Sequence, residues 1–194
     1  VRSWIEAIRA SAAPRLRGAG ILIRPHPQNL DQWKGVDLSD LGPVALWPAE
    51  VQAPADEQGR RDYFDSIHHS AAVVGINTTA EIESAIIGRS VFTVTAPEFS
   101  ETQGGTLHFE HLRQVNGGLL HVAAGLAEHV GQLESAMQNP GADDSRCRRF
   151  VEAFVAKWGS RVMRYPLTRD DVVDYANIAG STPVAPAALA DVVT

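Results

Sequence analysis

The sequence has 194 residues, of which 44% are hydrophobic and 21% are charged, as is usual for one folded domain with an appended segment. No apolar run reaches the roughly 18 residues that a membrane helix needs. The net charge of -6 argues against a general nucleic-acid binder, which needs a basic face, so we expect no nucleic-acid partner. The single cysteine, Cys147, excludes an internal disulfide and favours a cytoplasmic protein.

The first part of the chain is predicted to hold an amphipathic helix and two short buried strands. The helix carries apolar residues at helical spacing: Trp4, Ile5, Ile8 and Leu16. Residues 20–23 form an all-apolar run that leads into Arg24-Pro25-His26-Pro27, and residues 43–47 form a second run, which Pro48 stops.

The middle of the chain alternates helices and strands. Apolar residues at helical spacing alternate with short apolar runs, and Gly88 marks the end of one helix. The expected order is a helix over residues 61–70, a strand over 71–76, a helix over 80–87 and a strand over 90–95.

Residues 97–118 are predicted to be a long polar loop, and loops of that length are usually functional or mobile. A strand over 119–123 and helices over 126–137 and 143–158 follow. Because short apolar strands alternate with helices, the pattern predicts an α/β protein with a doubly wound parallel sheet. We expect one domain over residues 1–140, with a C-terminal helix and an irregular tail over 141–194.

Three polar clusters follow predicted strands, where ligands bind in doubly wound sheets. In the first, the prolines around Arg24 and His26 stiffen the backbone, which suits these side chains to a phosphate. The alternative is that Arg24 pairs with a neighbouring carboxylate and His26 is a surface histidine.

The second cluster lies between the strand over 71–76 and the helix over 80–87. Hydroxyl groups and free N–H groups at the start of a helix form a site that suits an anion. The alternative is a plain N-cap, in which Thr78 or Thr79 caps the helix and Glu81 or Glu83 closes a capping box.

The third cluster lies in the predicted loop and contains Gly104, Gly105, Thr106, His108, Glu110 and His111. The spacing His-x-Glu-His is a weak indication of a metal site. We instead expect the start of a helix, with one histidine facing a ligand or solvent, and no bound metal.

These motifs, in this order, resemble a known family. The Arg-Pro-His-Pro motif, the run HHSAAVVGINTTAEIESAIIGRSVFTV and the run GGLLHVAAGLAEHVGQL are similar to the C-terminal domain of GT-B glycosyltransferases. The family makes capsules and teichoic acids, and includes CDP-glycerol glycerophosphotransferases, bacterial polysialyltransferases and capsular Kdo transferases. The likeness spans roughly residues 3–138. It implies a Rossmann-like sheet forming one half of a GT-B fold, with the N-terminal half upstream.

The resemblance implies binding of a nucleotide-activated donor, either a nucleotide-diphosphate sugar or a CDP-alcohol. The donor phosphates would be held by Arg24, His26, Thr78 and Thr79. The nucleotide and ribose would be held by Asn77, Glu81 and Glu83. Further contacts would come from the loop residues Gly104, Gly105, Thr106, His108 and Arg113. No cofactor or metal is expected, which agrees with the lack of an Asp-x-Asp motif.

This sequence departs from the family pattern in having threonines where serines are commoner, and in having no second Rossmann half. Because the family's catalytic base lies in that N-terminal half, we expect this chain to bind donor without turning it over. The complete enzyme would serve a cell-surface polysaccharide or related acceptor, with peripheral membrane association. Two alternatives are a domain like the UDP-N-acetylglucosamine 2-epimerases and a non-catalytic interaction module derived from a GT-B half.

Overall fold

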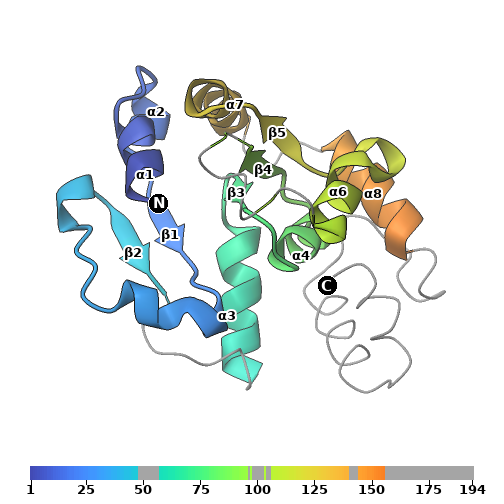
Figure 1. The fold of residues 1–194 in the computed structure, drawn as a ribbon, viewed down its shortest axis with the longest axis horizontal. Helices are drawn as coiled ribbons and strands as arrows, with labels where there is room; N and C mark the ends of the chain where they lie inside the picture. The colour runs from blue at the N-terminus through green and yellow to red at the C-terminus, as the bar shows by residue number, and fades with distance from the viewer. Residues whose placement is uncertain (48–56, 96, 98–102, 104–105, 140–143, 156–194) are drawn as a thin grey trace. The chain divides into compact units, whose positions relative to one another are not determined.

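A computed structural model describes residues 1–47, 57–95, 97, 103, 106–139 and 144–155 (Figure 1). Its internal contacts divide the chain into two compact units, Val1–Tyr63 and Phe64–Thr194. The domain expected over residues 1–140 spans this division, and its extent stays a prediction. Within the described ranges, no helix is both long enough and apolar enough to cross a membrane.

The first unit packs short helices around a two-stranded parallel sheet. Strand β1 pairs with β2 in the register Ile21↔Val44 and Ile23↔Leu46. The predicted helix is two helices, because Pro14 begins a second one, and residues 27–33 and 39–41 form 3-10 helices that the sequence did not predict. The elements are α1 (Arg2–Arg9), α2 (Pro14–Arg17), β1 (Ile21–Ile23), β2 (Val44–Leu46) and α3 (Glu57–His68), the last running on into the second unit. Its buried apolar residues include Ile5, Ile8, Leu16 and Leu41.

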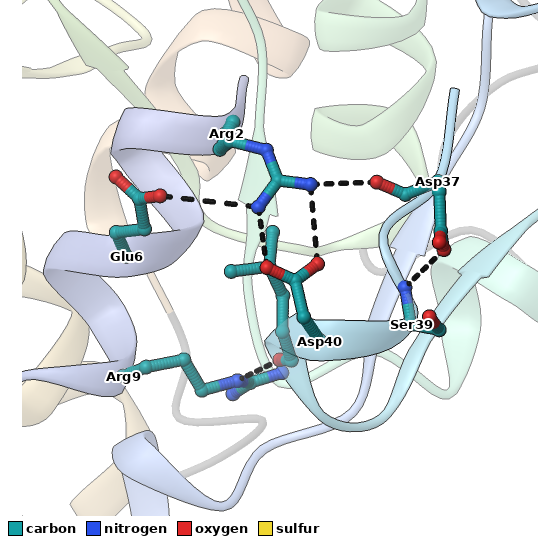
Figure 2. A network of polar contacts seen from close by, with 7 residues as sticks. Arg2, Glu6, Arg9, Asp37, Ser39 and Asp40 are labelled. Carbon is teal, nitrogen blue, oxygen red and sulfur yellow. Dashed lines mark hydrogen bonds and ion pairs between the residues drawn. The ribbon is translucent and has the colours of Figure 1, made fainter.

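Two arginines of α1 tie this unit together in different ways (Figure 2). Arg9 donates from Nε to the carbonyl of Leu41 at 2.7 Å, and from Nη1 to the carbonyls of Arg17 and Ala19, both at 2.9 Å. Arg2 instead forms a bidentate pair with the exposed Asp40, at 2.7 and 3.1 Å. Arg9 therefore satisfies three backbone carbonyls in two segments of the chain, whereas Arg2 makes a surface ion pair and donates to the carbonyl of Asp37 at 2.6 Å.

We expect Arg9→Ala to lower the free energy of unfolding by about 2 kcal/mol, because carbonyls at the edge of the core lose a charged donor. Arg2→Ala should cost less than Arg9→Ala, since solvent screens an exposed pair. Urea denaturation of both variants measures the difference. Equal losses would show that the carbonyl contacts of Arg9 contribute no more than a surface ion pair.

The second unit contains a three-stranded parallel sheet in the order β3-β4-β5. All four residues of the central strand are buried, which explains its unbroken run of apolar and β-branched residues. Figure 1 shows α7 on one side of these strands and α4, α6 and α8 on the other. The elements are β3 (Val73–Val74), α4 (Ala80–Ile87), β4 (Val91–Val94), α6 (Leu107–Gln114), β5 (His121–Ala123), α7 (Leu126–Gln138) and α8 (Ser145–Val155).

The hydrophobic core of this unit joins helices and strands that are far apart in the sequence. It contains Ile82, Ala85, Ile86, Val91, Phe109, Leu112, Leu119, Leu120, Cys147, Phe150 and Val151. Burial raises the pKa of the Cys147 thiol far above its usual range, so this thiol is a core side chain and no nucleophile. Of the predicted C-terminal segment, residues 144–155 are described and contain α8.

The prediction of one long loop over residues 97–118 was wrong in its second half. Residues 107–114 form α6, which confirms the helix start expected in the third cluster, and residues 115–117 form a 3-10 turn. The Thr106 hydroxyl caps α6 by accepting from the Phe109 N–H at 3.3 Å, while Phe109 and Leu112 pack into the core. The described residues thus form an α/β protein with parallel strands, in one sheet of two strands and one of three.

Candidate functional site

A hydrogen-bonded network joins the carboxyl end of β3 to the start of α6. The Asn77 amide nitrogen donates to the Thr106 hydroxyl at 3.0 Å, which leaves its carbonyl oxygen facing His108 Nδ1 at 2.7 Å. His108 Nδ1 must therefore carry the proton and donate to Asn77. The network fixes the tautomer in which His108 Nε2 is a hydrogen-bond acceptor.

His108 is buried, with 4% of its surface exposed, and is neutral in this setting. Burial, and next the charge of His111, lower the pKa of the imidazole. His108 Nε2 has no hydrogen-bond partner among the residues that the structure describes. A buried acceptor without a partner is rare in folded proteins, and a bound water, ion or ligand is one explanation for it.

Gln103 follows β4 and adds a second acceptor of the same kind. Its amide nitrogen donates to the Thr93 hydroxyl at 2.9 Å, and the side chain is buried. Gln103 Oε1 is left without a partner in the described part of the chain. The sequence did not single out this residue, since a polar side chain in a polar stretch just before two glycines gives no sign of its burial.

Glu81 is the most deeply buried ionisable group of the cluster, with 1% of its surface exposed. Its Oε2 accepts from the Thr78 N–H at 2.9 Å, while its Oε1 has no partner in the described ranges. Burial raises the pKa of this carboxyl to about 7, against the opposing effect of the Thr78 N–H. Near neutral pH the carboxyl therefore exchanges readily between its two charge states.

A glycine makes room for the Glu81 side chain. A Cβ atom at Gly75 would lie 2.4 Å from Glu81 Oε1, closer than real Cβ contacts come. The Gly75 N–H bonds to the Phe92 carbonyl at 3.0 Å, so Gly75 continues β3 beside Thr93. Neighbouring positions in a parallel pair point to the same face, which places Glu81, Thr93 and Gln103 on one face of the sheet.

The first turn of α4 shows the capping interactions that the sequence left open as an alternative. The Thr78 hydroxyl accepts from the Ala80 N–H at 3.0 Å, and Glu81 reaches back to the Thr78 N–H. The Thr78 hydroxyl hydrogen is still a donor that a ligand can use, and Thr79 is exposed. Ribose binding by Glu81 stays a prediction, and it would require this side chain to leave its buried position.

Arg24 and His26 belong to the first unit. The Arg24 guanidinium lies 4.6 Å from the ring centroids of both Trp47 and Tyr63, and these cation–π contacts hold it in place. His26 is exposed at the end of β1. A shared role of these residues with Thr78 in donor binding stays a prediction.

The other predicted contacts are placed as follows. His108 and Arg113 lie on helix α6 instead of in a loop, and exposed Arg113 pairs with Glu110 at 2.9 Å. Glu83 is half-buried on α4, and Gly104 and Gly105 lie outside the described residues. In the parts of the chain that are described, no three His, Cys, Asp or Glu side chains are grouped to hold a metal ion.

Comparison of the chain with models of protein families, with curated proteins and with solved structures gives no match.

Proposed function

We propose that this chain binds a nucleotide-activated donor, as the donor half of a GT-B transferase built on a Rossmann-like doubly wound sheet. The observation that carries the proposal is the polar cluster at the carboxyl ends of β3 and β4, where α4 and α6 begin. Open α/β sheets bind their ligands at this edge, because helix N-termini there present N–H groups and a positive dipole.

In the second unit, some residues would contact the donor and others would hold the adjoining turn in place. The Thr78 hydroxyl hydrogen and the exposed Thr79 lie at the start of α4, where the helix dipole favours a diphosphate. Asn77, Thr106 and His108 hold the adjoining turn in one conformation through their mutual hydrogen bonds. Positive potential at a departing phosphate stabilises the transition state of an inverting transfer.

The remaining requirement of such a transfer is a base that takes the proton of the acceptor. Under this proposal the N-terminal half of the complete enzyme supplies the base, as the resemblance implies. The donor is a nucleotide-diphosphate sugar or a CDP-alcohol, and the acceptor is a cell-surface polysaccharide or a related molecule. Arg24 and His26 would add charge at the donor phosphates.

A thermal-shift screen against CMP, CDP, UDP, UDP-sugars and CMP-sialic acid tests the proposal. A ligand at about 100 times its dissociation constant stabilises a protein by about 2.7 kcal/mol. A rise in the unfolding temperature with one nucleotide identifies the nucleobase that the chain binds. If no compound in the panel raised the unfolding temperature, the result would contradict donor binding by this chain and would favour the non-catalytic interaction module.

Two variants then test the predicted phosphate contacts by calorimetry. We expect His26→Ala and Thr78→Ala each to weaken binding of the active nucleotide by about 1 to 3 kcal/mol, the loss typical of a charge-assisted hydrogen bond. Thr78→Ser keeps the hydroxyl and should bind like the wild type, and His69→Ala is the control for an exposed histidine outside the cluster. Unchanged affinity in His26→Ala or Thr78→Ala would remove that residue from the site.

A further inference from the structure

We propose that an anion which binds at the start of α4 is taken up together with a proton, and that Glu81 carries this proton. The inference rests on the proposed function, because it assigns a charge balance to the same site. It makes donor affinity depend on pH near neutrality. It also changes the role of Glu81 from a ligand contact to a buried acid beneath the site.

The geometry places the carboxyl directly at the helix start. Glu81 Oε2 accepts from the Thr78 N–H at 2.9 Å, and the Thr78 hydroxyl accepts from the Ala80 N–H of the same turn at 3.0 Å. Glu81 Oε1 is turned toward Gly75 and has no partner among the described residues. An ionised carboxylate here leaves one oxygen unsatisfied and puts a negative charge beside the bound phosphate, and both effects are unfavourable.

Among the described residues of the elements packed on α4, no positive charge contributes to the pKa of Glu81. The helix α4 packs against β3, β4 and α8, and neither of these strands carries an ionisable side chain. The charged residues that are described on α8, namely Arg146, Arg148, Arg149 and Glu152, do not contribute to the shifted pKa of Glu81, which burial dominates. Burial lowers the pKa of His108, which the network brings to the same edge of the sheet, and so disfavours its positive charge. A proton is therefore the charge that can compensate the anion.

The step is a simple protonation. One proton from solvent adds to the ionised carboxylate and gives the neutral acid, with no covalent change in the ligand. The proton would reside on Oε1, because Oε2 keeps its bond to the Thr78 N–H. Because the pKa of Glu81 is about 7, about half of the free protein has an ionised Glu81 at neutral pH. This half must take up a proton when the anion binds.

Titration calorimetry of the wild-type chain measures the number of protons taken up on binding. CDP is titrated at about pH 7 in two buffers of different ionisation enthalpy, and we expect net uptake of about half a proton per CDP bound. The dissociation constant should be about tenfold larger at about pH 8 than at about pH 6, since only the neutral acid binds well. Sulfate serves as a second probe, because its own charge does not change over this range, whereas the terminal phosphate of CDP titrates.

A variant separates Glu81 from the other groups that titrate. Glu81→Gln is permanently neutral and similar in size, so it should bind with no Glu81-linked proton uptake and with an affinity for sulfate that is nearly the same at both pH values. Glu128→Gln is the matched control, because Glu128 also accepts a backbone N–H at the start of a helix, from Ala124 at 2.8 Å, but is exposed. Glu128→Gln should show the same proton uptake and the same pH dependence of affinity as the wild type.

Three results would overturn the inference. Wild-type binding without proton uptake and with the same affinity at both pH values would reject it while the proposed function stood. Uptake that persists unchanged in Glu81→Gln would assign the proton to another group. Failure of CDP, UDP and sulfate to bind at either pH would reject the proposed function, and the inference with it. The wild-type measurements alone can still reject the inference if the variant does not fold.

Discussion

We expect Glu81→Gln to remove about 3 kcal/mol of pH dependence from the free energy of unfolding. The pKa of Glu81 rises from an ordinary value of 4.5 to about 7 in the folded protein, so the folded chain binds more protons between these values. Its contribution to stability is fully present below 4.5 and is lost as the pH rises through about 7. At high pH the wild type is therefore destabilised by a buried carboxylate that the variant does not have.

Urea denaturation at several pH values between about 4.5 and 8 measures this effect as the difference between wild type and variant. The difference should shift by about 3 kcal/mol in favour of the variant as the pH rises through this range. Glu128→Gln should follow the wild type throughout, because its carboxylate is exposed. A constant difference between wild type and Glu81→Gln would mean that Glu81 ionises normally in the folded chain.

Wild type and Glu81→Gln must be compared at each pH, because two buried histidines change the stability with pH in the opposite direction. Burial lowers the pKa of His129 to about 4, and burial also lowers the pKa of His108. Their contributions to stability are lost as the pH falls below the ordinary histidine value of 6.5. Both histidines are present in wild type and variant, so their effect cancels in the difference.

The elements that the sequence predicted best are those whose boundaries are set locally. The helix over residues 80–87 was predicted with both of its ends, because the Thr78 hydroxyl accepts from the Ala80 N–H at its start and Gly88 adopts a left-handed φ of 87° at its end. Strand β4 lies within the predicted residues 90–95, since a strand buried on both faces is apolar throughout.

Helix α6 was predicted only as a helix start at the third cluster, within a segment that was otherwise expected to be a loop. Its polar and charged side chains, and the two glycines before it, favoured a loop. The pair Phe109 and Leu112, at helical spacing behind Thr106, was the signal that could have located it. Strand β3 is shorter than predicted, Val73–Val74 against residues 71–76, although the Gly75 N–H still bonds to the Phe92 carbonyl.

The candidate site was predicted in part, and the unpredicted part depends on long-range contacts. The sequence singled out Asn77, Thr78 and Glu81 because they follow a strand and begin a helix. It did not indicate that Asn77 bonds to His108, which lies 31 residues further along the chain. Nor did it indicate that Glu81 is buried, since an acidic residue in the first turn of a helix is usually exposed and only packing decides otherwise.

We expect Gly75→Ala to be among the most destabilising single changes in the second unit, with a loss of about 2 to 4 kcal/mol. The new Cβ would lie 2.4 Å from Oε1, 2.5 Å from Cγ and 2.7 Å from Cδ of Glu81. Glu81 cannot move aside cheaply, because it is buried and holds the Thr78 N–H. Displacing it breaks this bond and disturbs the start of α4.

A double-mutant cycle with Glu81→Ala isolates this contact. If the clash with Glu81 causes the loss, the Gly75→Ala substitution should cost about 2 kcal/mol less in the Glu81→Ala background than in the wild type. Gly131→Ala is the control, because a Cβ at this position on α7 meets nothing within 4 Å and should raise helix stability slightly. Equal costs of Gly75→Ala in both backgrounds would place the strain in the backbone of the β3–α4 turn. A large coupling would show that the glycine is needed to keep the acid beneath the proposed anion site.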